Sequence, residues 1–257
     1  MTDLSESAAS ALGPLDIEAP FGRRAPDEAA RAAWRLATAP DMPPAVRKAN
    51  RKRIAGDQRG PFDVTVEELR FRAYPAENRC DRVMVGRGML PEPQEHELLA
   101  RFVGEGAVFI DIGANVGAYA LWAARRVGPA GLVIALEPHP RTFAKLLFNR
   151  AANGAENLHC LNVAAGPDTR TATLSFDGGG NVGGASLLAG AAGTGAGTMV
   201  AVRPLADVLS GHKIGRTDVI KVDVEGYEDR ALLPYFDHAP KARWPKTIMI
   251  ETVLSDR

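Results

Sequence analysis

The sequence has little cysteine, few aromatic residues and no excess of charge of either sign. Its two cysteines among 257 residues, Cys80 and Cys160, lie far apart and form no CxxC pair. This pattern excludes a disulfide framework and a cysteine zinc site, and it predicts two buried free thiols. Basic and acidic residues both number 31, so no net charge draws the whole protein to nucleic acid or to an anionic membrane.

Secretion signals and long apolar runs are also absent. The first twenty residues contain acids where a signal peptide has bases, and they contain no sustained apolar segment. The most apolar stretches, VFIDIG and GLVIALEP, are much shorter than the roughly 20 residues of a membrane-spanning helix. We therefore expect a cytoplasmic protein without a transmembrane segment. Hydrophobic residues make up 46% of the chain, which is enough for a substantial core.

Residues 1–60 are rich in Ala, Pro and charge, and we interpret them as an N-terminal arm, partly helical or disordered, outside the core. A helix is predicted near 27–39, and the Pro43-Pro44 pair ends it. The basic run RKANRKR, from Arg47 to Arg53, is interpreted as a solvated helix face, with a site for an acidic partner as the alternative.

Residues 61–105 form a lead-in to the core. Alternation and β-branched content predict two short strands, in VTVEELRFRAY and in RVMVG, and PEPQEHELLARFV reads as an amphipathic helix.

From residue 106 to 257, apolar strands alternate with helical segments, which predicts a Rossmann-like, doubly wound, mostly parallel α/β sheet. The strands are expected in AVFID, GLVIALE, LHCLNV, DVIKVD and TIMIE, in the order 3-2-1-4-5. The glycine-rich residues 178–197 are expected to form a mobile loop and a candidate lid.

A glycine turn and an acidic residue follow the first two strands of this core. Gly113 and Gly117 in DIGANVG permit a tight turn at a helix N-terminus, where a ligand can lie against the backbone. The GxxxG spacing differs from the GxGxxG of dinucleotide enzymes, so a ligand without a pyrophosphate fits better. Glu137 ends the second strand, where an acid accepts hydrogen bonds from ribose hydroxyls. Together these residues predict a ribonucleoside cofactor.

Three acids, Asp223, Glu225 and Glu228, follow the fourth strand. If the strand order reverses there, they lie beside the first strand, in the crevice where doubly wound sheets bind ligands. A buried strand has no structural need of terminal acids, so we favour function. The alternatives are helix capping by Asp223 and compensation of the helix dipole by Glu225.

In order along the chain, VFIDIGANVG, VIALEPHP, LNVAAG, DVIKVDVEGYE and IMIE resemble the motifs of the FkbM family of S-adenosylmethionine-dependent methyltransferases. The resemblance covers about Phe62 to Glu251, and it implies a class I methyltransferase fold with S-adenosylmethionine as cofactor. It also implies methylation of a hydroxyl on a small molecule, sugar or secondary metabolite. The ending DVEG, in place of N/D-P-P-Y/F, disfavours methylation of a nucleobase nitrogen.

The resemblance also implies roles for individual residues. Glu137 would hold the ribose, and the end of the third strand would lie near the adenine. The full set of implied cofactor-binding residues is Asp111, Gly113, Ala114, Asn115, Gly117, Glu137, Pro138, Asn162, Val163 and Ala164.

Asp223 and Glu225 are the candidate catalytic bases, and Glu251 is a reserve, because an alcohol needs a carboxylate to take its proton. A metal site is not predicted. Magnesium shared by Asp223 and Glu225 is the minority alternative, since no third ligand is evident. Lys221 is expected to pair with one of these acids.

Two other functions share these features. A nicotinamide-dependent oxidoreductase would have the same sheet and ribose acid, but the absent GxGxxG disfavours it. A non-catalytic nucleoside-binding protein would keep the pocket, but not the acids of the fourth strand. In the family's sheet two further strands follow the fifth, and we expect this chain to lack them. TIMIE would then be an apolar edge. Either the chain is a truncated or incomplete form, or the lead-in strands or a second subunit cover that edge.

Overall fold

A five-stranded parallel sheet forms the centre of the computed structural model, which describes residues 14–176, 185–187 and 197–251. The strands run in the order β11-β10-β3-β4-β5. Their bounds are Val108–Ile112 for β3, Leu132–Leu136 for β4, Leu158–Leu161 for β5, Val219–Val222 for β10 and Thr247–Ile250 for β11. Ile110 of β3 pairs with Ile134 of β4 and with Ile220 of β10. The predicted Rossmann-like sheet and its strand order are confirmed.

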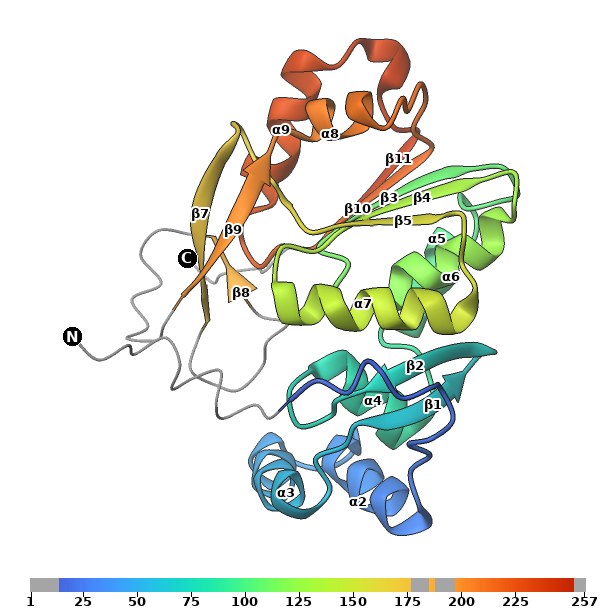
Figure 1. Cartoon of the computed structure of the whole chain (residues 1–257), viewed down its shortest axis with the longest axis vertical. Helices are drawn as coiled ribbons and strands as arrows, with labels where there is room; N and C mark the ends of the chain where they lie inside the picture. Colours follow the sequence, from blue (N-terminus) through green and yellow to red (C-terminus); the bar gives the residue numbers. More distant parts are fainter. Residues whose placement is uncertain (1–13, 177–184, 188–196, 252–257) are drawn as a thin grey trace, which may run out of the picture.

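Helices cover both faces of this sheet (Figure 1). On one side lie α5 (Pro93–Leu99), α6 (Ala118–Val127) and α7 (Pro140–Asn153), and on the other lie α8 (Leu205–Gly211) and α9 (Glu228–His238). Successive residues of β3 enter different cores, since Phe109 packs with the first group and Ile110 with the second. Burial on both faces explains why these strands read as continuous apolar runs.

Glycine and proline residues mark the ends of helices α6 and α7 in the central unit. Gly117, with φ of 94°, precedes α6, and Gly128 follows it. Pro140 opens α7, and the side chain of His139 accepts a hydrogen bond from the backbone amide of Thr142. Gly154 ends α7 in the left-handed conformation, which costs glycine little.

The lead-in contains one hairpin and two helices. Strands β1 (Phe62–Val66) and β2 (Leu69–Ala73) are antiparallel and both lie within VTVEELRFRAY. The prediction of a strand in RVMVG is wrong, because these residues belong to α4 (Arg79–Arg87). Asn78 caps this helix by accepting from the Cys80 amide, and one face, including Met84 and Val85, is buried. The cap and the helical spacing of the buried residues outweigh the β-branched content of this segment.

The N-terminal residues contribute more to the core than expected. Helices α2 (Glu28–Thr38) and α3 (Pro44–Asp57) precede the hairpin, and α2 packs against α4. Trp34 of α2 is completely buried in the same apolar cluster as Phe71 of β2. The expectation that the whole arm lies outside the core is therefore wrong for α2. The division into three regions at residues 60 and 105 stays a prediction.

A second sheet stands beside the central one (Figure 1) and was not foreseen. It contains β6 (Ala164–Ala165), β7 (Arg170–Phe176), β8 (Ala185–Ser186) and β9 (Thr198–Arg203), in the order β6-β9-β7-β8. The antiparallel strands β7 and β9 flank the glycine-rich stretch. Most of that stretch lies outside the described residues, so the predicted lid stays a prediction.

The outer strand β11 has an uncovered edge in the described part of the chain. It follows a short 3-10 turn, Lys241–Arg243, and pairs only with β10. Ile248 and Ile250 are 38% and 43% exposed. The lead-in strands pair with each other, so the expectation that they cover this edge is wrong, while cover by a second subunit stays a prediction. Across the described residues, none of the helices has the length and apolar character needed to cross a membrane.

Candidate functional site

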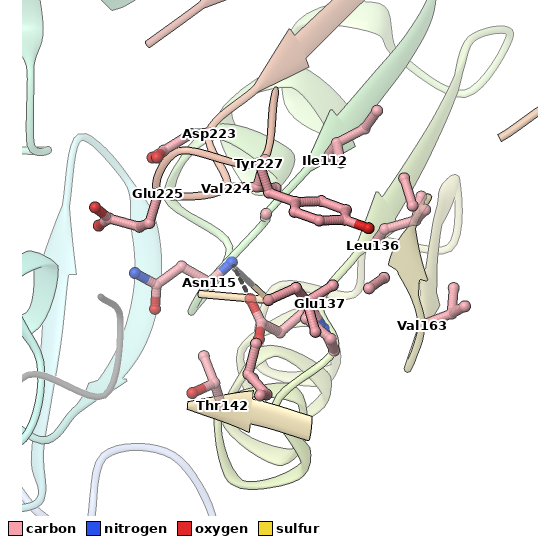
Figure 2. Close-up of a pocket in the computed structure, with 16 residues that line it drawn as sticks. Ile112, Asn115, Leu136, Glu137, Thr142, Val163, Asp223, Val224, Glu225 and Tyr227 are labelled. Carbon is pink, nitrogen blue, oxygen red and sulfur yellow. Dashed lines mark hydrogen bonds between the residues drawn. The ribbon is translucent and has the colours of Figure 1, made fainter. Parts of the chain in front are cut away.

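The main cleft lies at the carboxyl ends of β3, β4, β5 and β10, where doubly wound sheets bind ligands (Figure 2). Its empty volume is about 640 Å³, including the part open to solvent. Eight of the predicted site residues line it: Gly113, Asn115, Glu137, Pro138, Val163, Ala164, Asp223 and Glu225. The predicted residues that do not line the cleft are Asp111, Ala114, Gly117 and Asn162. Any contribution from them is indirect, through the residues that line it.

The glycine turn joins the two sides of the cleft. The backbone amides of Gly113 and Ala114 both donate to the carbonyl oxygen of Leu136, at 3.0 Å each. Gly113 has φ of 81°, and a Cβ there would collide with the carbonyl oxygen of Asp223. Close packing of the β10 loop therefore requires Gly113. A Cβ at Gly117 would collide with the side chain of Leu146 of α7, so this glycine packs against α7 and does not face the cleft.

Glu137 lies at the end of β4, as predicted, and its carboxylate is fixed by two backbone amides. Asn115 N donates to Oε2 at 2.9 Å and His139 N donates to Oε1 at 2.8 Å. Burial raises the pKa of Glu137 to about 7, although these two hydrogen bonds lower it. Each oxygen keeps a lone pair, so the carboxylate can still accept from two hydroxyl groups of a ligand.

The end of β5 forms the apolar wall of the cleft. Val163 and Ala164 line the space, whereas the side chain of Asn162 points back and donates to the carbonyl oxygens of Glu137 and Pro138 at 2.8 and 2.9 Å. Asn162 therefore positions the Glu137 segment.

Two buried charges lie behind the cleft. Asp111 is completely buried, and burial raises its pKa to about 6. Lys221 Nζ lies 3.7 Å from Asp111 Oδ1 and 3.3 Å from Asp223 Oδ2. Lys221 therefore pairs with acids, as expected. Burial lowers the pKa of Lys221, but the charges of Asp111 and Asp223 raise it overall, so the lysine stays protonated between them. Asp111 therefore lies behind the cleft, beside the ammonium group of Lys221.

Carboxylates gather at the opposite side from Glu137. Figure 2 shows Asp223 and Glu225 together, with Asn115 near them. Burial and then repulsion from Asp223 raise the pKa of Glu225, and the same two causes raise the pKa of Glu251 to about 7. Among the described residues, no group of three or more His, Cys, Asp or Glu side chains is arranged to hold a metal ion.

The capping role considered for Asp223 is wrong, because α9 has no side-chain cap. The Glu228 side chain accepts from the backbone amides of Val224 and Gly226, at 3.2 and 3.0 Å. Helix α9 begins after Tyr227 without a side-chain cap, so Asp223 does not cap it. Asp223 lines the cleft, where its side chain pairs with Lys221 and shares a hydrogen bond with Glu251.

Sequence reasoning missed several lining residues. Tyr227 is 1% exposed and its hydroxyl accepts from Arg170 Nη2 at 2.9 Å, which ties the cleft wall to β7. Thr142, from the first turn of α7, lines the floor. The remaining missed residues are Ile112, Leu136, Ala165, Leu174, Leu187 and Val224. Tyr227 could have been noticed from its place in the VEGYE motif, but apolar wall residues have no such signal.

Comparison with known proteins places this geometry in a family. Residues 111–251, more than half of the chain, match the Methyltransferase FkbM domain. A search of curated proteins found no match.

Similar solved structures are distant. An O-methyltransferase from Bacillus cereus in complex with SAH is 16% identical with a TM-score of 0.36, over 60% of this chain and 53% of that one. M. jannaschii TYW2 in complex with AdoMet is 21% identical with a TM-score of 0.32, over 39% and 42%. This chain covers 39–43% of the length of the first three matching structures. The assignment therefore rests on the domain match: the chain belongs to the FkbM family of methyltransferases.

Proposed function

We propose that this protein is an S-adenosylmethionine-dependent O-methyltransferase that acts on a hydroxyl of a small molecule, sugar or secondary metabolite. One observation carries the proposal: a single cleft has a buried acid suited to a ribose on one side and paired carboxylates on the other. We also propose a cytoplasmic location, which remains an expectation from the sequence.

The cofactor side suits a nucleoside without a pyrophosphate. The Glu137 carboxylate can accept from both ribose hydroxyls, and Val163, Ala164 and Leu136 offer an apolar surface to a base. The turn after β3 has no bare stretch of amides for a pyrophosphate, because the amides of Gly113 and Ala114 already donate to Leu136. This disfavours the nicotinamide alternative.

The acid side suits the acceptor. When bound, S-adenosylmethionine supplies a methyl group on a sulfonium, and the acceptor oxygen forms a bond to that carbon as the carbon–sulfur bond breaks. The proton of the acceptor hydroxyl then needs a base, and the carboxylate of Asp223 or Glu225 can take it. Lys221, 3.3 Å from Asp223, holds that carboxylate in place. Alignment and exclusion of water supply the rest of the rate.

Calorimetry tests the proposal. S-adenosylmethionine is titrated into the wild type and into Glu137→Ala and Asp223→Asn, with NADH as the control ligand. We expect micromolar binding to the wild type and little change in Asp223→Asn. Glu137→Ala should lose at least about tenfold in affinity, because one buried hydrogen-bonding carboxylate accounts for that much. Binding of NADH but not of S-adenosylmethionine would overturn the proposal.

A further inference from the structure

A second hollow lies between α3, α4 and the start of α5, and arginine side chains dominate its lining. Its empty volume is about 990 Å³, including the part open to solvent. The arginines are Arg47 and Arg51 of α3 and Arg79, Arg82 and Arg87 of α4, and Glu92 is the one acid that lines the hollow with them. Two residues of the basic run RKANRKR, interpreted from the sequence as a solvated face, therefore turn toward three arginines of another helix.

These arginines are only partly compensated by the protein. Arg87 donates Nε and Nη2 to the carbonyl oxygen of Thr38, and Arg79 Nη1 lies 3.5 Å from Glu92 Oε1. Arg47 Nε, in contrast, is buried without a hydrogen-bond partner among the described residues. A buried donor without a partner is unfavourable, and an acceptor bound in the hollow would offset that cost.

Repulsion within the cluster points in the same direction. Burial and then the nearby charge of Arg51 lower the pKa of Arg82 to about 10. The hydrogen bond from Arg82 to the Pro75 carbonyl oxygen is long at 3.4 Å. Like charges gathered in one hollow favour a bound anion. A phosphate fits best, because several guanidinium groups can each donate two parallel hydrogen bonds to its oxygens.

A series of contacts joins this hollow to the acid side of the main cleft. Glu92 lines the hollow, and its Oε2 accepts from the Tyr119 hydroxyl at 3.1 Å. Lys221 Nζ lies 4.8 Å from the centre of the Tyr119 ring and 3.3 Å from Asp223 Oδ2. Burial and the charge of Asp223 raise the pKa of Glu225, and the charge of Arg79 opposes this rise, so Arg79 acts on the acid side of the cleft. The hollow is therefore next to the site where the acceptor hydroxyl would react.

We propose, on the basis of the proposed function, that the methyl acceptor bears a phosphate or diphosphate group that binds in this arginine hollow. The acceptor hydroxyl then faces Asp223 and Glu225, while Arg47, Arg51 and Arg82 hold the phosphate oxygens. The volume exceeds that of a single phosphate, so a diphosphate or a phosphorylated sugar fits the space.

Titration of inorganic pyrophosphate, followed by calorimetry at low salt, tests this proposal. The variant Arg47→Gln/Arg51→Gln removes two charges from the hollow. The matched control, Lys48→Gln/Lys52→Gln, removes two charges from the same helix at positions that do not line it. We expect the arginine variant to weaken pyrophosphate binding by at least about tenfold and the lysine variant by less than about twofold. Equal weakening in both variants, or no binding to the wild type, would overturn the proposal.

Two further measurements separate the outcomes. S-adenosylmethionine binding to each variant is measured in parallel, and it should not change. If S-adenosylmethionine binds and pyrophosphate does not, the hollow fails and the proposed function stands. The reverse result rejects the proposed function, and with it the methyl acceptor, and leaves the hollow as an anion site. Vesicles that contain phosphatidate distinguish the source of the phosphate. Arginine-dependent binding of the vesicles supports a lipid-linked phosphate, and binding of pyrophosphate alone supports a soluble one.

Discussion

The two sides of the main cleft have different kinds of partners. On the cofactor side, Glu137 accepts hydrogen bonds from the backbone amides of Asn115 and His139. On the acid side, Asp223 has side-chain partners, since it pairs with Lys221 and shares a hydrogen bond with Glu251, whose pKa burial and the charge of Asp223 raise to about 7. Backbone partners are set by the fold, whereas side-chain partners can be exchanged one at a time. The β-α-β geometry therefore fixes the cofactor side, while substitutions on the acid side can adapt it to an acceptor.

The largest effect is expected at Gly113, where the two sides meet. In Gly113→Ala the new Cβ would collide with the Asp223 carbonyl, and the alanine backbone would be held in a left-handed conformation. We therefore expect a loss of roughly 3 kcal/mol or more in the free energy of unfolding. Denaturant titration measures this loss. Gly154→Ala is the matched control, because its Cβ meets no atom within 4 Å and only the backbone conformation is strained. Equal losses in both variants would contradict the close approach of the two sides.

The second effect separates chemistry from cofactor binding. Asp223→Asn keeps the shape of the side chain but removes the base, so we expect methyl transfer to slow by about 100-fold or more. The assay follows transfer of a labelled methyl group to the acceptor found by screening phosphorylated hydroxy compounds. Calorimetry on the same variant should give an S-adenosylmethionine affinity within about threefold of the wild type, since Asp223 lies opposite the ribose acid. An unchanged rate would move the role of base to Glu225 or Glu251.

The third effect is a pH dependence that belongs to the cofactor side alone. Because burial raises the pKa of Glu137 to about 7, the carboxylate is mostly protonated at pH 6 and mostly ionised at pH 8. The ionised form accepts the ribose hydroxyls, so S-adenosylmethionine affinity should rise by about tenfold from pH 6 to pH 8. Glu137→Gln should bind more weakly and show a flat profile. A wild-type profile that is already flat would show that Glu137 does not hold the ribose in its ionised form.

For the free protein the sign is opposite. A carboxyl whose pKa is higher in the folded state than in the unfolded state favours folding below its unfolded pKa, and this contribution is lost as the pH rises through about 7. The wild type should therefore lose stability relative to Glu137→Gln between pH 5 and 8, which are about the limits of this titration.

The smallest effect concerns the contact between the lead-in and the cofactor side. Asn78 Nδ2 donates to Asn115 Oδ1 at 2.6 Å, while Asn78 Oδ1 caps α4. Asn78→Asp keeps the cap and removes the donor, so we expect a stability loss of about 1 kcal/mol and an affinity loss within about threefold. Thermal unfolding and calorimetry measure the two quantities. If the affinity falls much further, the lead-in is part of the cofactor site.

Much of the cofactor side could be predicted from the sequence because its residues follow consecutive strands. The positions of Gly113 and Glu137 follow from the strand ends, and the order of the strands brings Asp223 beside them. Asp111 was assigned to the cofactor because it begins the motif, but side-chain direction along β3 buries it against Lys221. Alternation along a fully buried strand leaves no pattern that reveals such a direction.

The rest depends on contacts between residues far apart in the chain. The hydrogen bond from Arg170 to Tyr227 and the packing of Trp34 with Phe71 have no local signal. The same is true of the arginine hollow, since the charges on α3 and α4 meet only because both helices pack against α2. Strands β7 and β9, in which apolar and polar residues alternate, were missed because they lie on either side of a glycine-rich stretch that is typical of a loop.

A crystal structure of the protein with S-adenosylhomocysteine tests the central claim most directly. We expect the ribose hydroxyls to lie about 3 Å from the Glu137 carboxylate, within hydrogen-bond distance, and the sulfur to face Asp223 and Glu225. A nucleoside bound away from Glu137, or with its sulfur turned away from both acids, would contradict it.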